Sequence, residues 1–335
     1  MSGMIRSASL TNYADVARAV GLDPLRLLAE VGLPLRCLQD PELKIPLDKA
    51  RQLLEISAER SGEEAFGLRM SETRQMSNLG PVGLLVREQP TLRSAIEAFI
   101  HYGRKLNGAL FLTLEESGEV AVLREVLIVG HGGPVRQATE LAIGVALRVL
   151  QLYLGPEWRA LRVCFAHDAP AKRDVHDRVF GRRVEFGHDF NGMVFPRADL
   201  ARPNPNADPA MVRYARQMID SGDAKEEPVM TAQVRELIVV LLGSGKCSID
   251  LVAQHLGVDR RTVHRRLAAE QQTYSGVLDA VRRELATRFM EDRTRTLAEV
   301  SLLLGFSAPS GFSRWYQEQF DRAPSAHRPR ASRRQ

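Results

Sequence analysis

The sequence predicts an α+β N-terminal domain followed by an all-α C-terminal domain. A chain of 335 residues is longer than most single hydrophobic cores, so two domains are the default expectation. Helical and strand-like periodicities alternate as far as residue 205, whereas only helical patterns follow Val229. The second part also contains an internal repeat. We therefore expect domains at 1–205 and 229–335, joined by a connecting helix and polar linker at 206–228.

Three N-terminal segments have the apolar periodicity of amphipathic helices. In the first segment, 23–33, Asp23 is the predicted N-cap and Pro24 the first helical residue. The segments 46–62 and 91–106 place apolar residues at the spacing of one helix face. The predicted apolar positions are Leu25, Leu28, Ala29, Leu47, Ala50, Leu54, Ala58, Leu92, Ala95, Ile96 and Phe99.

The pattern then changes to that of β-strands. Residues 108–129 contain two runs rich in Leu and Val that flank Glu-Ser-Gly-Glu, which predicts a hairpin with glycine at its turn. A long apolar helix is expected from Val135 to Leu154. Short strands are expected within 161–167, 182–188 and 191–196. The N-terminal domain is therefore predicted to mix helices and strands.

Charge is distributed unevenly along the chain. Residues 231–335 contain 17 Lys and Arg against 11 Asp and Glu, whereas residues 1–230 contain 29 against 30. The positive charge therefore belongs to the C-terminal part. This asymmetry favours a polyanionic partner for that domain alone.

Cysteine content and hydropathy argue against several classes of protein. Cys37, Cys164 and Cys247 are far apart and odd in number, so neither a disulfide framework nor a cysteine zinc site is indicated. The longest apolar stretch, 141–155, is broken by Arg148 and is too short to span a bilayer. The N-terminus lacks the apolar segment of a signal peptide, so we expect a cytoplasmic protein with no membrane partner.

The C-terminal part contains one pattern twice. The sequence SIDLVAQHLG at 248–257 is matched 48 residues later by TLAEVSLLLG at 296–305. After the glycine the shift becomes 49, because one residue has been inserted at the second turn. Each copy predicts a helix, a glycine turn and a second helix, together spanning 248–267 and 296–316.

The turns carry their own signals. Thr296 and Glu299 are a predicted capping box, and Gly305 supplies the left-handed residue that ends the first helix of the second copy. Asp259 and Ser307 are the predicted caps of the two second helices.

Positive charge gathers on the second helix of the first copy. Val263 and Leu267 are four residues apart and are expected to face the core. The outward residues are then Arg260, Arg261, His264 and Arg265. A short helix, a glycine turn and a second helix with an exposed polar N-terminal half define the helix-turn-helix, whose second helix enters the major groove. A solvated helix face is the alternative, but it would not need the duplication.

The second copy resembles a known family. Residues 297–328, LAEVSLLLGFSAPSGFSRWYQEQFDRAPSAHR, are similar to the second helix-turn-helix of AraC/XylS-type transcription regulators, with the Gly-Phe turn, Phe-Ser-Arg and Pro-Ser at that family's spacing. Asp321 departs from the pattern, because the family usually has glycine there. The helix at 274–290 resembles the family's linker helix. Its expected inner face carries Val277, Val281, Leu285 and Phe289.

The N-terminal part resembles a sensor domain. The segments GLDPLRLLAEVGLPLRCLQDPELKIP, FGLRM, GPVGLLVREQPTLRSAIEAFIHY and FGRRVEFGHDFNGMVFP are together similar to the arabinose-binding-like domain of the ornithine and arginine regulators. The two resemblances imply effector-controlled transcription, usually activation, through promoter DNA and RNA polymerase. They leave a homodimer open and imply no cofactor.

The resemblance also implies a set of DNA contacts on the two second helices. These are Arg260, Arg261, Thr262, His264, Arg265, Ser307, Ala308, Ser310, Ser313, Arg314 and Gln317. Effector-binding residues are not specified.

Two segments resemble motifs of enzymes, and an architectural DNA-binding protein is a further alternative to a regulator. Residues 129–134 are similar to the oxyanion loop of esterases, but no G-x-S-x-G elbow exists, since GFSAP ends in proline. Residues 241–248 resemble a phosphate loop, but Val240 and Cys247 stand where that loop requires Gly and Ser or Thr. A ligand-independent architectural DNA-binding protein would not need a sensor domain.

Two groups of polar residues in the N-terminal part can each be interpreted in two ways. The first group is His167, Asp168, His176 and His188. These are either metal ligands or surface and hydrogen-bonded histidines, and their spacing fits no recognised ligand pattern. The second group is Tyr102, Arg104, Arg136 and Glu140. These either meet an effector or are surface residues, with an ordinary i,i+4 pair of Arg136 and Glu140.

Overall fold

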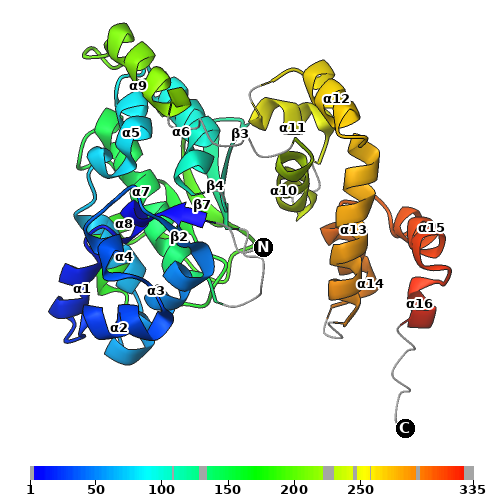
Figure 1. The fold of residues 1–335 in the computed structure, drawn as a ribbon, viewed down its shortest axis with the longest axis horizontal. Helices are drawn as coiled ribbons and strands as arrows, with labels where there is room; N and C mark the ends of the chain where they lie inside the picture. The colour runs from blue at the N-terminus through cyan, green and yellow to red at the C-terminus, as the bar shows by residue number, and fades with distance from the viewer. Residues whose placement is uncertain are drawn as a thin grey trace. The chain divides into compact units, whose positions relative to one another are not determined.

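The chain divides into two compact units, Met1–Ala224 and Lys225–Gln335 (Figure 1). The computed structural model describes residues 4–107, 109–127, 134–221, 230–243, 247–256, 258–291 and 295–327. Over these residues the first unit combines helices with two sheets and the second unit is helical, as the sequence predicts. Within the described ranges, no helix is both long and apolar enough to cross a membrane.

The first unit has helices that pack on its sheets and on one another. They are α1 (Tyr13–Ala19), α2 (Pro24–Val31), α3 (Leu47–Ser61), α4 (Phe66–Glu72), α5 (Gly80–Arg87), α6 (Leu92–Leu106), α7 (Arg136–Leu154), α8 (Asp174–Phe180) and α9 (Pro209–Ser221). Short 3-10 helices are η1 (Ser7–Leu10), η2 (Leu35–Leu38), η3 (Met76–Leu79) and η4 (Arg197–Ala201). The predicted cap of α2 forms, because the Asp23 carboxylate accepts hydrogen bonds from the N–H groups of Leu25 and Arg26.

The larger sheet has the strand order β3-β4-β7-β5-β6. Its strands are β3 (Leu110–Ser117), β4 (Val120–Leu127), β5 (Arg162–Cys164), β6 (Val184–Glu185) and β7 (Asn191–Pro196). The predicted hairpin is β3–β4, with Gly118 at φ +57° in its turn. All neighbouring strands are antiparallel except β5 and β6. A separate two-stranded sheet pairs β1 (Met4–Arg6) with β2 (Lys44–Pro46).

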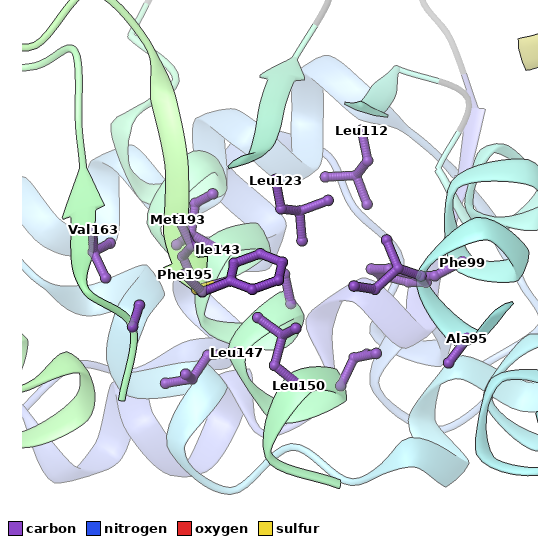
Figure 2. Packing of buried hydrophobic residues seen from close by; sticks show 14 of the residues in the cluster. Ala95, Phe99, Leu112, Leu123, Ile143, Leu147, Leu150, Val163, Met193 and Phe195 are labelled. Carbon is purple, nitrogen blue, oxygen red and sulfur yellow. The ribbon is translucent and has the colours of Figure 1, made fainter. Parts of the chain in front are cut away.

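One core lies between the larger sheet and the helices α6 and α7. Figure 2 shows Leu123, Met193 and Phe195 of the strands against Ile143 and Leu147 of α7. These side chains are almost completely removed from solvent. Alternate residues of β4 are buried, and these residues pack against the long apolar face of α7. The strand period of two and the helix period of 3.6 residues thus place both sets of side chains in one layer.

Burial confirms the predicted apolar faces of α3 and α6, but of the three positions predicted for α2 only Leu28 is buried. The side chain of Leu25 is 48% exposed, and Ala29 is exposed as well. The buried stripe of α2 is instead Leu27, Leu28 and Val31, which faces α3. The predicted face was displaced around the helix because the segment has leucines on both faces, so Leu25 and Ala29 were chosen where Leu27 and Val31 are buried.

The helix α9 belongs to the first unit. It packs against α5 through Ala215 and Ile219, which are buried in the same core as the sheet. Trp158 of the same core packs edge-on against Phe195 and donates a hydrogen bond from its indole N–H to Asp199 at 2.9 Å. The predicted polar linker, 223–228, lies outside the described residues, as does most of the basic C-terminal tail.

The second unit is a set of short helices arranged along one long helix. They are α10 (Met230–Gly243), α11 (Ile249–His255), α12 (Arg260–Ala269), α13 (Tyr274–Glu291), α14 (Leu297–Leu303), α15 (Pro309–Phe320) and α16 (Pro324–His327). In Figure 1, α13 runs from the end of α12 towards α14 and α15.

Gly144 is expected to be indispensable for the packing of α7 on α4. A Cβ atom at this position would lie 2.5 Å from Ser71 Cβ and would overlap Ser71 Oγ. We therefore expect Gly144→Ala to destabilise the first unit by about 1–3 kcal/mol, as overpacking does. The control is Gly103→Ala in α6, where a Cβ would meet nothing within 4 Å. That change should stabilise the protein by about 0.5–1 kcal/mol, as Gly-to-Ala changes in helices do.

Thermal unfolding of the two variants and the parent protein, followed by circular dichroism, checks this expectation. A stabilised Gly144→Ala protein would show that α4 and α7 are not packed as closely as the structure has them.

Candidate nucleic-acid interface

The first helix-turn-helix consists of α11 and α12. Ser248 caps α11 by accepting a hydrogen bond from the N–H of Leu251 at 3.2 Å. The N–H of Val258 donates to the carbonyl of Ala253 at 3.1 Å and so closes the turn, while Gly257 lies outside the described residues. The capped helix and closed turn together fix where the second helix begins.

The helix α12 begins at the predicted cap. The Asp259 carboxylate accepts hydrogen bonds from the N–H of Thr262 at 2.7 Å and from its hydroxyl at 3.0 Å. These bonds favour the ionised carboxylate and lower the pKa of Asp259, with the backbone N–H contributing most. Because the hydroxyl of Thr262 already donates a hydrogen bond to the cap residue, it is less available to DNA than the sequence alone implied.

The two faces of α12 are separated as predicted. Val263 and Leu267 are completely buried. The four predicted outward residues, Arg260, Arg261, His264 and Arg265, are exposed, and so is Arg266. The guanidinium of Arg260 lies 3.9 Å from the Asp250 carboxylate of α11, and both of these side chains remain mostly in solvent. The N-terminal half of α12 thus presents a cationic surface.

The second helix-turn-helix consists of α14 and α15. The predicted capping box is present: the N–H of Glu299 donates to Thr296 Oγ1 at 3.2 Å, and the N–H of Thr296 donates to the Glu299 carboxylate at 2.5 Å. Gly305 has φ +71°, and the N–H of Phe306 donates to the carbonyl of Ser301 at 3.1 Å. The first helix and its turn therefore follow the same plan in both copies.

The predicted cap of α15 at Ser307 is wrong. Ala308 is the N-cap residue, makes no side-chain hydrogen bond, and precedes Pro309 at the first helical position. The proline ring fixes φ near the helical value and so sets the start of the helix. The inserted residue of the second copy thus lies before the cap, and Asp259 corresponds to Ala308 rather than to Ser307.

The helix α15 also has a buried and an exposed face. Phe312, Trp315 and Tyr316 are buried against residues of α13 and α14. The exposed side chains around the N-terminus and outer face are Ser307, Ala308, Ser310, Ser313, Arg314 and Gln317. This outer face is mainly neutral and polar, whereas that of α12 is cationic.

The long helix α13 holds the second motif by two polar contacts. The indole N–H of Trp315 donates to the Asp279 carboxylate at 3.0 Å. The guanidinium of Arg282 donates to the carbonyl of Leu304 at 3.1 Å and lies 4.2 Å from the centre of the Phe306 ring. Both the turn and the second helix of the motif are therefore fastened to α13.

The buried face of α13 changes along the helix and does not follow the single predicted face. Val277 and Val281 are buried as expected, whereas Leu285 and Phe289 are only partly buried. The fully buried positions further along are Ala286 and Met290. Ala286 follows Val277 by nine residues, which is about half a turn around the helix axis at 3.6 residues per turn, so the second half of α13 buries the opposite face, against the second motif.

Glu270 is a structural residue that the sequence did not reveal. Its carboxylate accepts hydrogen bonds from the N–H groups of Met230 at 2.7 Å and Thr231 at 2.8 Å, and from the Thr231 hydroxyl at 2.6 Å. It thereby caps α10 from the end of α12. No local pattern signals this contact, because the partners are about 40 residues apart in sequence.

Asp321 adopts the conformation for which the family uses glycine. It ends α15 with φ 53° and ψ 24°, which is the left-handed region. Aspartate is among the few residues that enter this region at moderate cost. The departure from the family pattern therefore leaves the shape of the turn intact.

In the first unit, Glu140 is the centre of a buried polar cluster. Its carboxylate lies 3.1 Å from Arg136 Nε, 3.1 Å from His176 Nε2 and 3.3 Å from His167 Nε2. The i,i+4 pair with Arg136 thus forms, but Glu140 is fully buried rather than exposed. Burial lowers the pKa of His167.

The residues weighed as metal ligands do not meet at one point. His188 lies apart from the histidines at Glu140, and Asp168 is exposed. Donor atoms of Cys164, Glu185 and His188 instead lie within 4.8 Å of one another. Burial raises the pKa of the Cys164 thiol to about 11.

The remaining candidates from the sequence are only partly visible. Tyr102 is half-buried, with its ring 4.4 Å from that of His101. The side chain of Arg104 lies outside the described residues. The same holds for most of the esterase-like segment, 129–133, and for the centre of the phosphate-loop-like segment, 244–246.

An α+β unit that is followed in the sequence by two helix-turn-helix motifs joined by a helix defines a class of DNA-binding transcription regulators. Family comparison agrees: residues 21–204 match the arabinose-binding domain of AraC transcription regulators, and residues 252–330 match a helix-turn-helix domain. The first match covers more than half of the chain, which therefore belongs to the AraC family. It is a transcription regulator and not an enzyme.

Individual relatives extend over nearly the whole chain. The HTH-type transcriptional regulator VirS of Mycobacterium tuberculosis is 29% identical over 331 residues, which are 98% of this chain and 97% of VirS. The ornithine utilization regulator of Pseudomonas aeruginosa is 28% identical over 316 residues, covering 93% and 91% of the two chains. The crystal structure of the regulator CdpR from Pseudomonas aeruginosa aligns with a TM-score of 0.44 at 20% identity, over 91% of this chain and 96% of CdpR.

The contact between Trp315 and Asp279 is expected to stabilise the second unit. Trp315 is 8% exposed, so Asp279→Ala leaves an indole N–H buried without its acceptor. The expected cost is about 1–3 kcal/mol. The control is Glu284→Ala on the same helix, which removes an exposed ion pair with Arg235 and should cost at most about 1 kcal/mol.

Urea unfolding followed by circular dichroism compares the two variants. Equal stability of the Asp279→Ala and Glu284→Ala proteins would contradict a fastening role for the Trp315 hydrogen bond.

Proposed function

We propose that this chain is a transcription activator. It places α12 and α15 in successive major grooves of promoter DNA. The observation that carries this proposal is that both helices turn an exposed polar face outward from a packed scaffold: α15 is fastened to α13, and α12 packs on α10, which itself packs on α13. A helix that packs on one side and exposes its N-terminal half is the form in which proteins read base edges.

The two helices are expected to contribute differently. Arg261 and Arg265 are one turn apart on α12, and arginine pairs with the guanine edge through two hydrogen bonds. Arg260 and His264, which are also exposed near the N-terminus of α12, are suited to phosphates. On α15, Ser310, Arg314 and Gln317 supply fewer charges, so we assign this helix mainly polar base contacts and backbone contacts.

The proposal gives the first domain, 1–205, the task of sensing a small molecule, and the second, 229–335, the task of binding DNA. Support comes from the family of the first domain and from the concentration of positive charge in the second. The remaining partners are RNA polymerase, contacted at the promoter in the cytoplasm, and a second copy of the chain where operators are repeated.

Removing Arg261 and Arg265 together is expected to reduce specificity as well as affinity. A lost guanine contact is worth about 1–3 kcal/mol of discrimination, whereas a lost phosphate contact weakens all DNA alike. Binding of the Arg261→Ala/Arg265→Ala protein to its operator and to scrambled DNA of equal length, at fixed salt, gives the ratio directly.

The matched control is Arg213→Ala/Arg216→Ala, which removes the same charge from an exposed face of α9. The control should keep the ratio of operator to scrambled binding. If the α12 variant weakens on both DNAs by the same factor, these arginines contact only the backbone.

Spacing of the two sub-sites is expected to be fixed at about 10 to 10.5 base pairs for one molecule. Inserting five base pairs rotates one sub-site to the far side of the duplex, so binding should fall towards the non-specific level. Inserting a full turn restores the face but exceeds what α13 spans, so it should rescue binding poorly. Gel shifts with the three operators at one salt concentration test this.

Undiminished affinity for the five-base-pair insertion would mean that only one motif contacts DNA. In that case α12, with its cationic face, would be the reading helix and α15 would not enter a groove.

A further inference from the structure

The first unit contains a mostly apolar cavity of about 120 Å³. It lies among η1, α3, α6 and α7, close to the ends of β3 and β4. Apolar lining comes from Leu10, Leu54, Phe99, Leu106, Leu141 and Val145. Polar side chains enter this lining at few places, and three of them are the arginines Arg6, Arg51 and Arg74.

Arg74 carries a buried charge without a described counter-ion. Its side chain belongs to a residue that is 9% exposed, and its Nη1 donates to the carbonyl of Ala8 at 2.6 Å, while Nη2 donates to the carbonyl of Ser9. No carboxylate of the described residues forms an ion pair with it. Burial without a compensating charge lowers the pKa of Arg74 to about 10.

Arg6 provides the contrast within the same cavity. It is equally buried, but it pairs with the Glu42 carboxylate, to which its Nε donates at 2.9 Å. Holding the two carbonyls of η1 would need only neutral donors, so the positive charge of Arg74 is not explained by that role. A buried charge normally has a partner, because its desolvation is costly.

Unused hydrogen-bond donors gather on the same lining. Within the described part of the chain, Ser9 Oγ, Arg51 Nε and Arg74 Nε are buried and have no hydrogen-bond partner. All three residues line the cavity. Buried donors are nearly always satisfied in proteins, so three such groups at one cavity indicate an acceptor that the described residues do not supply.

We propose that this cavity binds a small apolar monocarboxylic acid, whose carboxylate pairs with Arg74 and whose hydrocarbon part fills the apolar lining. The proposal rests on the sensing role proposed above and names the chemical class of the effector. A carboxylate supplies both the missing negative charge and the acceptors for the unused donors. Phosphate fits less well, because its several charged oxygens would face leucine and phenylalanine side chains.

The size of the cavity limits the acid. A protein cavity of about 150 Å³ holds one benzene molecule. The part of the hydrocarbon that the cavity encloses should therefore have about five or six carbon atoms. Hexanoate is a suitable probe, with hexan-1-ol as the same chain without the charge.

Calorimetric titration of the full-length protein with the two probes at neutral pH tests the proposal. We expect saturable binding of hexanoate and at least tenfold weaker binding of hexan-1-ol. Arg74→Gln should reduce hexanoate affinity at least tenfold and leave hexan-1-ol unchanged. Because Arg74 also holds η1, a second variant, Ala142→Leu, fills the cavity from α7 with Arg74 intact and should abolish binding of both probes.

The control variant is Arg216→Gln, which removes an exposed arginine from α9 and should bind hexanoate like the parent protein. Absence of saturable hexanoate binding, equal affinity for the two probes, or unchanged hexanoate binding by Ala142→Leu would each overturn the assignment. Operator binding measured on the same variants separates the two proposals. If hexanoate binds as expected but changes neither operator affinity nor reporter transcription, the cavity assignment holds and the sensing role fails.

Discussion

The second unit depends on one helix, α13, against which the second motif packs directly and the first motif packs through α10. Val277 and Val281 contribute to its first half and Ala286 and Met290 to its second, and all four are buried. A helix of 18 residues is about 27 Å long, which is of the order of one turn of DNA. Because a helix does not stretch, the separation of the two outward faces is a property of the fold and not of the operator. In the proposed mode of binding, the operator would therefore be selected for a spacing that the fold sets.

Local signals in the sequence predicted the second unit well. The duplication, the caps at Asp259 and Thr296 and the left-handed Gly305 concern residues that are close in sequence, so their physical causes are visible in a short window. The wrong cap, Ser307, arose where an inserted residue and Pro309 compete to set the start of a helix, and the predicted inner positions Leu285 and Phe289 of α13 were also wrong. Glu270 could not be found, because its role depends on a helix about 40 residues away.

The first unit was predicted less completely, since its polar chemistry depends on tertiary packing. Glu140 has the sequence spacing of a surface pair, and only the fold shows that two histidines and a helix layer cover it. Glu125 shows the same limit, because it takes an inward position on β4, where burial raises its pKa to about 8. Arg74 lies in a segment with no distinguishing pattern, and its lack of a counter-ion is visible only when its surroundings are known.

The tryptophan at the junction of α13 and α15 gives the chain a built-in optical probe. The sequence has two tryptophans, Trp158 in the first unit and Trp315 in the second, and each donates its indole N–H to an aspartate. Indole emission depends on local polarity, so each ring should change its fluorescence when its own unit opens. In a variant that retains only one of the two tryptophans, indole fluorescence would therefore report on a single unit. The order in which the two units unfold could then be followed without any added dye.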